Sequence, residues 1–404
     1  MNYKAEFSSE NFLSLGRACY EIGKLMENLF NSHDTLLIPS RGAWPLAEVA
    51  VGIYYYIAKM LGEESNLSNV RIISLLRDYV GFTNFKSITK QYEGGKQIIV
   101  APLTADVSIE DSLIGVEGRS RDELSEMLTE EIRKYGARLI NSFYKRPEKR
   151  KGDPYFKFFD FILREIEGRD DLAREYEIFP AIRNAIMVDT AISGRAFTTV
   201  MKNLIELGRQ PYGLLVADKD GGKLKKEYKG WLLKWINSGK LLMTTVHKIL
   251  SEDRGAGLLG VSGVIYPQLI IRFRDILSPL GAVTWHPLPQ YKEYREAFSS
   301  FERTLFEAAK VAWAEDEIPE RKNEYLDCFN KRLIEFHNIV EKYGSRVLTT
   351  PVVRSNFIRY PYKKITESSA HVIHVYFSEH TLDKLRKRFQ SFLEADLNAN
   401  YKLR

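Results

Sequence analysis

Short apolar runs alternate with stretches of helical periodicity along the first half of the chain. Apolar residues at helical spacing predict an amphipathic helix over 10–31, and two further helices are predicted over 45–61 and 197–208. Apolar runs as short as buried strands are found at 35–40, 70–76, 96–103, 185–189 and within 211–222. This alternation of strand and helix predicts an α/β fold with a mostly parallel sheet.

The pattern changes in two later regions. Residues 105–180 are helix-patterned and are joined by a basic linker, which predicts a helical insertion into the sheet domain. Residues 230–404 combine strand candidates with a long helical region at 290–343, which predicts a mixed α+β region. We therefore divide the chain into an α/β core (1–104 and 181–229), a helical insertion (105–180) and a C-terminal mixed domain of unknown role (230–404).

Composition places the chain among ordinary globular proteins. Its 404 residues are 44% hydrophobic and 28% charged, and it contains no apolar run of the roughly 18 residues that a membrane span needs. The first residues lack the apolar stretch of a signal peptide, and the two cysteines are too far apart to indicate a disulfide framework. We expect a cytoplasmic protein without membrane contact.

The stretch AIMVDTAISGRAFTTVMKNLIELG, residues 185–208, reads as a strand, a tight loop and a helix. The first amides of a helix have no partner within the helix, so such a loop is an anion site. Thr190 and Ser193 add hydroxyl groups, and Gly194 lets the backbone approach a phosphate closely. Asp189 comes at the carboxyl end of the strand, where open α/β sheets bind ligands. A ribose 5-phosphate has both the phosphate and the hydroxyls that this set of groups would bind.

The segment VDTAISGRA resembles the phosphoribosyl-pyrophosphate motif of type I phosphoribosyltransferases, in which two acids precede a Thr/Ser-Gly turn. Val188 stands at the first acid position and Asp189 at the second. The resemblance implies that Asp189 holds the ribose hydroxyls and that the following residues surround the 5-phosphate. These residues are Thr190, Ala191, Ile192, Ser193, Gly194 and Arg195.

A second segment, LLIPSRGAWPLA at 36–47, is similar to the pyrophosphate loop of the same family. The resemblance implies that Ser40, Arg41, Gly42 and Ala43 contact the pyrophosphate. Arg41 suits this role because a guanidinium pairs with phosphate oxygens through two parallel hydrogen bonds.

Two other parts of the chain are candidates because of where they stand in the sequence relative to these motifs. The stretch 77–95 stands where the family has a mobile hood, and its Lys86 and Lys90 are either pyrophosphate ligands or solvated loop lysines. Asp218 and Asp220 follow a predicted strand near the expected base site, and equally fit a plain acidic turn.

The resemblance implies a protein that binds phosphoribosyl pyrophosphate and Mg²⁺ and transfers phosphoribose to or from a nucleobase-like acceptor. Asp189 and Arg41 would be the catalytic residues, Mg²⁺ would stabilise the leaving pyrophosphate, and a homodimer is the common state of the family. The histidines of HVIHVYFSEH alternate across a predicted strand, so they predict no metal site formed by the protein alone.

An alternative from another class stays open. Val188 removes one acid, which costs a charge-assisted hydrogen bond of about 1.5–3 kcal/mol. The chain would then be a non-catalytic nucleotide sensor or effector whose additional regions contact a protein partner. The net charge of +6 and the basic stretches 145–152 and 223–235 also leave nucleic-acid binding open beside the simpler interpretation of solvated surfaces.

Overall fold

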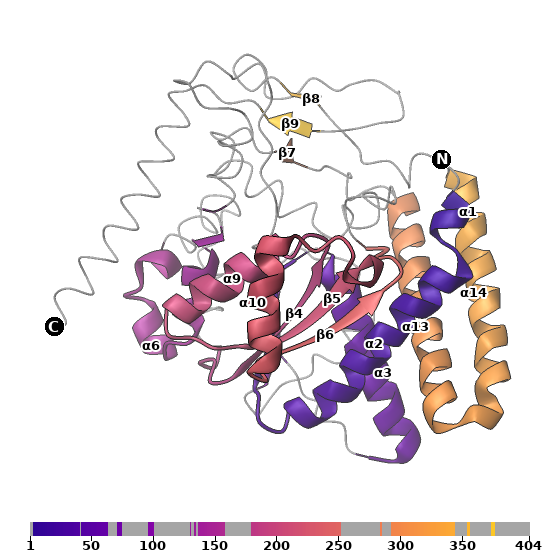
Figure 1. Cartoon of the computed structure of the whole chain (residues 1–404), viewed down its shortest axis with the longest axis horizontal. Coiled ribbons are helices and arrows are strands. Elements are labelled where there is room, and N and C mark those ends of the chain that lie inside the picture. Colours follow the sequence, from indigo (N-terminus) through magenta and orange to yellow (C-terminus); the bar gives the residue numbers. More distant parts are fainter. Residues whose placement is uncertain are drawn as a thin grey trace.

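A six-stranded sheet forms the centre of the protein, and all its neighbouring strands are parallel (Figure 1). The strands lie in the order β2-β3-β1-β4-β5-β6. They are β1 (Thr35–Ile38), β2 (Arg71–Ser74), β3 (Gln97–Val100), β4 (Ala185–Ala191), β5 (Tyr212–Asp218) and β6 (Leu241–Val246). The side chains of β1 and β4 are buried along their whole length, as in a parallel sheet covered on both faces. The predicted α/β class with a mostly parallel sheet is therefore confirmed.

The structure, a computed structural model, describes residues 3–40, 42–63, 71–74, 96–100, 130, 133–134, 136–157, 179–251, 283–284, 292–343, 354–355 and 373–375. Several of the candidate residues lie outside these ranges. They are Arg41, Lys86 and Lys90, together with the whole of the 77–95 stretch.

Helices cover both faces of the sheet (Figure 1). One face carries α2 (Ser9–Leu29) and α3 (Ala43–Leu61), against which α13 (Lys292–Glu317) packs, and the other carries α9 (Arg195–Glu206) and α10 (Lys226–Asn237). The predicted helical region at 290–343 consists of α13 and α14 (Lys322–Tyr343), which pack together as a hairpin. None of the helices described here is long and apolar enough to cross a membrane.

The remaining elements are short. They are α1 (Tyr3–Glu6), α6 (Pro147–Arg150), η2 (Lys219–Gly221), η4 (Pro319–Arg321), β7 (Val283–Thr284), β8 (Arg354–Ser355) and β9 (Ile373–Val375). The last three strands form a separate small sheet in the order β7-β9-β8.

Residues from the C-terminal region contribute to the main core. β6 continues the parallel sheet beyond β5, and α13 packs against both α2 and α3. Aromatic rings join α2 to the α13–α14 hairpin, with Phe12 lying 5.5 Å from both Phe301 and Phe336 between ring centroids. Residues of α2 and of the α13–α14 hairpin, about 300 positions apart in the sequence, thus belong to one hydrophobic cluster.

Polar side chains at the amino ends of the strands set their register. The Asp34 carboxylate accepts hydrogen bonds from the backbone amides of Arg183, at 3.0 Å, and Asn184, at 3.3 Å. The buried side chain of Gln97 donates to the Thr35 hydroxyl at 3.1 Å, in register with the Thr35–Gln97 backbone pair. These bonds tie β1 to β3 and to β4.

The contact between α2 and α13 depends on the absence of a side chain at Gly16. A Cβ atom there would lie 2.5 Å from the Ala308 Cβ and 2.7 Å from the Ala309 nitrogen, so the helices would have to separate. We expect Gly16→Ala to lower the free energy of unfolding by about 1–3 kcal/mol, measured by urea denaturation.

A matched control for this variant lies in α10. Gly230 has open space where its Cβ would be, so Gly230→Ala should raise the free energy of unfolding by about 0.5–1 kcal/mol. A Gly16→Ala protein as stable as the wild type would contradict the close helix contact.

Candidate functional site

The two predicted loops follow neighbouring strands at the carboxyl edge of the sheet. β1 leads into α3 on one face and β4 leads into α9 on the other, and the strand order reverses between β1 and β4. Open α/β sheets bind their ligands outside the carboxyl ends of the strands at such a reversal. The topology therefore predicts a ligand site at this edge of the sheet.

Ser40 and Asp189 join the two loops. A hydrogen bond between their side chains offsets part of the rise that burial causes in the pKa of the Asp189 carboxyl. The Ser40 hydroxyl also accepts a hydrogen bond from the Ala43 amide at 3.0 Å, in the first turn of α3. Ser40 thus connects the start of α3 to the end of β4.

Asp189 is fully buried, and its two carboxylate oxygens have different surroundings. Oδ1 accepts a hydrogen bond from the Thr190 amide at 2.8 Å, whereas Oδ2 has no hydrogen-bond partner among the described residues. Burial raises the Asp189 pKa to about 7, against the opposing effects of Ser40, the Thr190 amide and the positive charge of Arg133. A carboxyl with this pKa is partly ionised at neutral pH and has one oxygen left to accept a hydrogen bond from a ligand hydroxyl.

The loop before α9 has the backbone that an anion site needs. Gly194 is the N-cap of α9 and has φ +83° and ψ −6°, a left-handed conformation that favours glycine. The Ser193 hydroxyl accepts a hydrogen bond from the Arg195 amide at 3.3 Å, and the Ser193 carbonyl accepts one from the Lys225 amide at 3.1 Å. Thr190 and Ala191 are buried, whereas Ile192, Ser193 and Arg195 are partly exposed. The exposed part of the loop is therefore its tip, three to six residues after buried Asp189.

The chain after β6 also lies at this edge of the sheet, where it contacts the loop between β1 and α3. The Ser251 hydroxyl donates a hydrogen bond to the Gly42 carbonyl at 2.6 Å. Two residues earlier, the Ile249 amide donates to Asp218 Oδ1 at 2.7 Å, and the Lys223 ammonium lies 3.8 Å from Asp218 Oδ2. Asp218 is buried and holds the backbone of this segment, while Asp220 is exposed in the η2 turn.

Sequence reasoning missed Arg133, which belongs to the segment predicted as an insertion. Arg133 is buried, with an exposed fraction of only 2%, and its charge lowers the pKa of Asp189. At helical spacing, Arg133 shares one face with Ala137 and Ile140, which are both buried. A basic residue on an otherwise apolar helix face was the signal that could have identified it.

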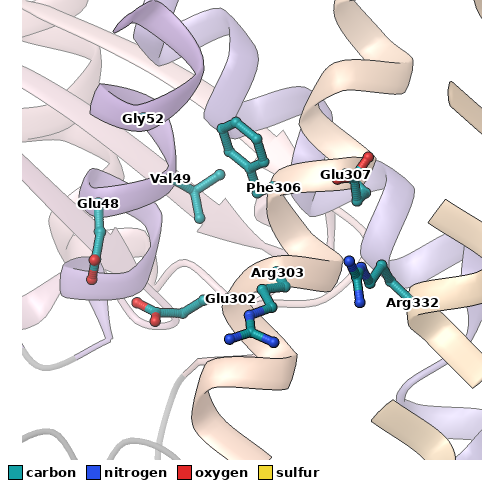
Figure 2. Close-up of a pocket in the computed structure, with 8 residues that line it drawn as sticks. All are labelled: Glu48, Val49, Gly52, Glu302, Arg303, Phe306, Glu307 and Arg332. Atoms are coloured by element: carbon teal, nitrogen blue, oxygen red, sulfur yellow. The ribbon is translucent and has the colours of Figure 1, made fainter. Parts of the chain in front are cut away.

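A second group of acids lies away from these loops, in a cavity of about 90 Å³ between α3, α13 and α14. Figure 2 shows the carboxyl groups of Glu48 and Glu302 directed toward each other, with Glu307 and Arg332 on the far side. Both Glu48 oxygens and Glu302 Oε1 are buried without a hydrogen-bond donor in the described structure. Within the residues described, no group of three or more His, Cys, Asp or Glu side chains could hold a metal ion.

The pKa values of this pair follow from its burial. Burial raises the Glu302 pKa to about 8, although the adjacent Glu48 carboxyl and the charge of Arg303 both act to lower it. Burial and the Glu302 charge raise the Glu48 pKa well above its ordinary range. The pair therefore retains protons at neutral pH, since two ionised carboxylates at this spacing would repel each other.

This pair predicts how stability depends on pH. A carboxyl whose folded pKa exceeds its unfolded value of 4.5 contributes stability below that value and loses it as the pH rises through about 8. We expect Glu302→Gln to remove this loss, so that the variant gains stability over the wild type as the pH rises from 5 to about 9. Urea denaturation at several pH values measures the effect, with exposed Glu227→Gln as the control. Curves that stay parallel for Glu302→Gln and the wild type would disprove it.

Comparison with known proteins adds no assignment to this geometry. The chain matched no protein-family model, no curated protein and no solved structure. The indication of function therefore comes from the residues at the carboxyl edge of β1 and β4.

Proposed function

We propose that the protein binds phosphoribosyl pyrophosphate at the carboxyl edge of β1 and β4 and transfers phosphoribose to or from a nucleobase-like acceptor. The observation that carries the proposal is the unpartnered Oδ2 of buried Asp189, beside Ser40 of the other loop. Leaving a buried polar atom without a partner costs about 1–3 kcal/mol. A ligand hydroxyl at Oδ2 would recover this energy.

In the proposed complex, each of the two loops binds a different part of the ligand. Asp189 accepts hydrogen bonds from the ribose hydroxyls, while the Ser193–Gly194 turn and the first amides of α9 bind the 5-phosphate. Ser40, Gly42 and Ala43 would lie along the pyrophosphate. Arg41 is the side chain that we propose for pairing with its oxygens, on the basis of the sequence resemblance.

The proposed reaction needs positioning and charge more than acid–base groups. The bond from C1 to the pyrophosphate oxygen breaks, and the pyrophosphate leaves with the electron pair. A nucleobase nitrogen supplies the pair that forms the new bond to C1, and its proton passes to the leaving pyrophosphate or to water. The ribose carbon becomes positive in the transition state, so ionised Asp189 near the hydroxyls favours it electrostatically.

We propose that Mg²⁺ enters the site bound to the phosphates of the ligand and is not held by the protein alone. The described structure contains no cluster of three metal-binding side chains, and Mg²⁺ is often held by one or two carboxylates together with substrate phosphates. Asp189 is the carboxylate of these loops that would help to hold it. When bound, the ion neutralises charge on the leaving pyrophosphate.

A nucleotide sensor is the second candidate, and one observation favours it. Val188, at the first acid position of the motif, is fully buried in the same hydrophobic cluster as Ile186 and Leu214. The motif therefore offers the ribose one acid, Asp189, instead of two. A sensor would bind the nucleotide in the same site and contact a protein partner through its other regions, in the cytoplasm. Release of pyrophosphate in the presence of common nucleobases separates the enzyme from the sensor.

Calorimetry with phosphoribosyl pyrophosphate and Mg²⁺ tests the binding site. We expect micromolar affinity for the wild type, about −8 kcal/mol. Asp189→Asn should weaken binding at least tenfold because the amide removes the charge from the hydroxyl contact. Asp327→Asn, which removes an exposed acid from α14, should bind as the wild type does. Absence of heat with the wild type, or equal affinity for Asp189→Asn, would refute the proposal.

The pH dependence of binding gives a separate prediction. Ionised Asp189 is the form that accepts two hydrogen bonds, and its pKa in the free protein is about 7. Affinity should therefore rise by roughly tenfold between pH 6 and pH 8.5, as the ionised fraction increases. The same titration with Asp189→Asn isolates the contribution of the ligand phosphates. If both proteins respond equally to pH, Asp189 does not bind the ligand through its charge.

A further inference from the structure

The segment 223–240 carries a concentration of positive charge on the surface. It contains six lysines and a single acidic residue, Glu227. Most of it forms α10, in which the buried side chains Leu232 and Trp235 pack on the body of the protein. The lysines therefore project from a helix that is already held by apolar contacts, and its folding does not require them.

We define the lysine face by Lys226, Lys229 and Lys234 of α10 together with Lys202 of α9. The three α10 lysines are exposed and Lys202 is partly buried. Within the part of the chain that the structure describes, none of the four forms an ion pair with a carboxylate, in contrast to α2 and α14, where Lys24 pairs with Glu317 at 2.6 Å and Lys322 with Glu315 at 2.7 Å.

An exposed aromatic ring lies next to two lysines of this face. Trp231 is 38% exposed, and the Nζ atoms of Lys202 and Lys234 lie 4.1 Å and 5.2 Å from its ring centroid. Leu233, also on α10, is 56% exposed. An exposed indole between ammonium groups combines a stacking surface with positive charge, which are the two features that bind single-stranded nucleic acids.

The lysine face begins beside the carboxyl edge of the sheet. The Lys225 amide, immediately before α10, donates to the Ser193 carbonyl of the loop that precedes α9. α9 and α10 pack against each other on the same side of the sheet (Figure 1). Their shared surface therefore runs from this loop along α10.

We propose that the lysine face and Trp231 bind single-stranded nucleic acid, with phosphates on the lysines and a base on the indole. Charge selects a polyanion, because the like charges of Lys226 and Lys229, three residues apart on the helix, repel each other and are stabilised by phosphates. A membrane would require a continuous apolar face, whereas the solvent side of α10 bears Lys226, Lys229 and Asn237 as well as Leu233. This surface does not depend on the proposed transferase activity.

Fluorescence anisotropy with a labelled 20-nucleotide poly(dT) or poly(U) strand tests the proposal. Lys226→Gln/Lys229→Gln/Lys234→Gln should weaken binding about a hundredfold at 0.1 M salt and reduce the slope of log affinity against log salt by about 2. The matched control, Lys59→Gln/Lys149→Gln/Lys331→Gln, removes the same charge from exposed positions on α3, α6 and α14 and should bind as the wild type does.

Two further variants separate stacking from charge and this surface from the ribose-phosphate site. Trp231→Ala should weaken binding roughly tenfold and Trp231→Phe less, because phenylalanine keeps a stacking surface. Asp189→Asn should leave binding of the strand unchanged. The proposal is overturned if the wild type does not bind either strand at low salt, if the two triple variants bind alike, or if the protein binds only phosphatidylserine vesicles.

Discussion

Parallel pairing between β1 and β4 is the constraint on which the rest of the protein depends. Asp34 fixes this pairing at the amino ends by accepting hydrogen bonds from the first amides before β4. With the register set there, both strands finish at the same edge, and Ser40 meets Asp189. A slip of one residue would turn Asp189 toward the hydrophobic core and Val188 away from it, because alternate residues of a strand face opposite sides.

Buried acids introduce a cost that this core must offset. Asp189 and the pair Glu48–Glu302 all have pKa values raised mainly by burial. They differ in what opposes that burial. Asp189 has a neighbouring hydroxyl, a backbone amide and the charge of Arg133, while Glu48 and Glu302 depend chiefly on each other. Asp189 therefore reaches its charged form more readily, which is the form that a ribose hydroxyl would select.

Much of the fold follows from local sequence, whereas the site depends on contacts between distant segments. The strands are predicted because parallel strands buried on both faces appear as continuous apolar runs. The end of α9 is predicted by Gly208, which adopts φ +75° directly after Leu207, the C-cap of the helix. Arg133 and Ser251 could not be placed from the sequence, because their partners are brought close only by the folded chain. Glu48 carried a weak signal as the only acid in the apolar run that forms α3.

The burial of Val188 bears on the choice between an enzyme and a sensor. Val188 fills space beside Ile186 and Leu214, so an acid there would be placed in apolar surroundings at a cost of several kcal/mol. Packing of the core thus explains why this chain has only one acid at the end of β4. In the proposed complex, one acid instead of two would weaken the contacts to the ribose and would leave the loops that would hold the phosphates unchanged. Since phosphoribosyl transfer depends on stabilising the leaving pyrophosphate, a single acid is compatible with catalysis as well as with binding.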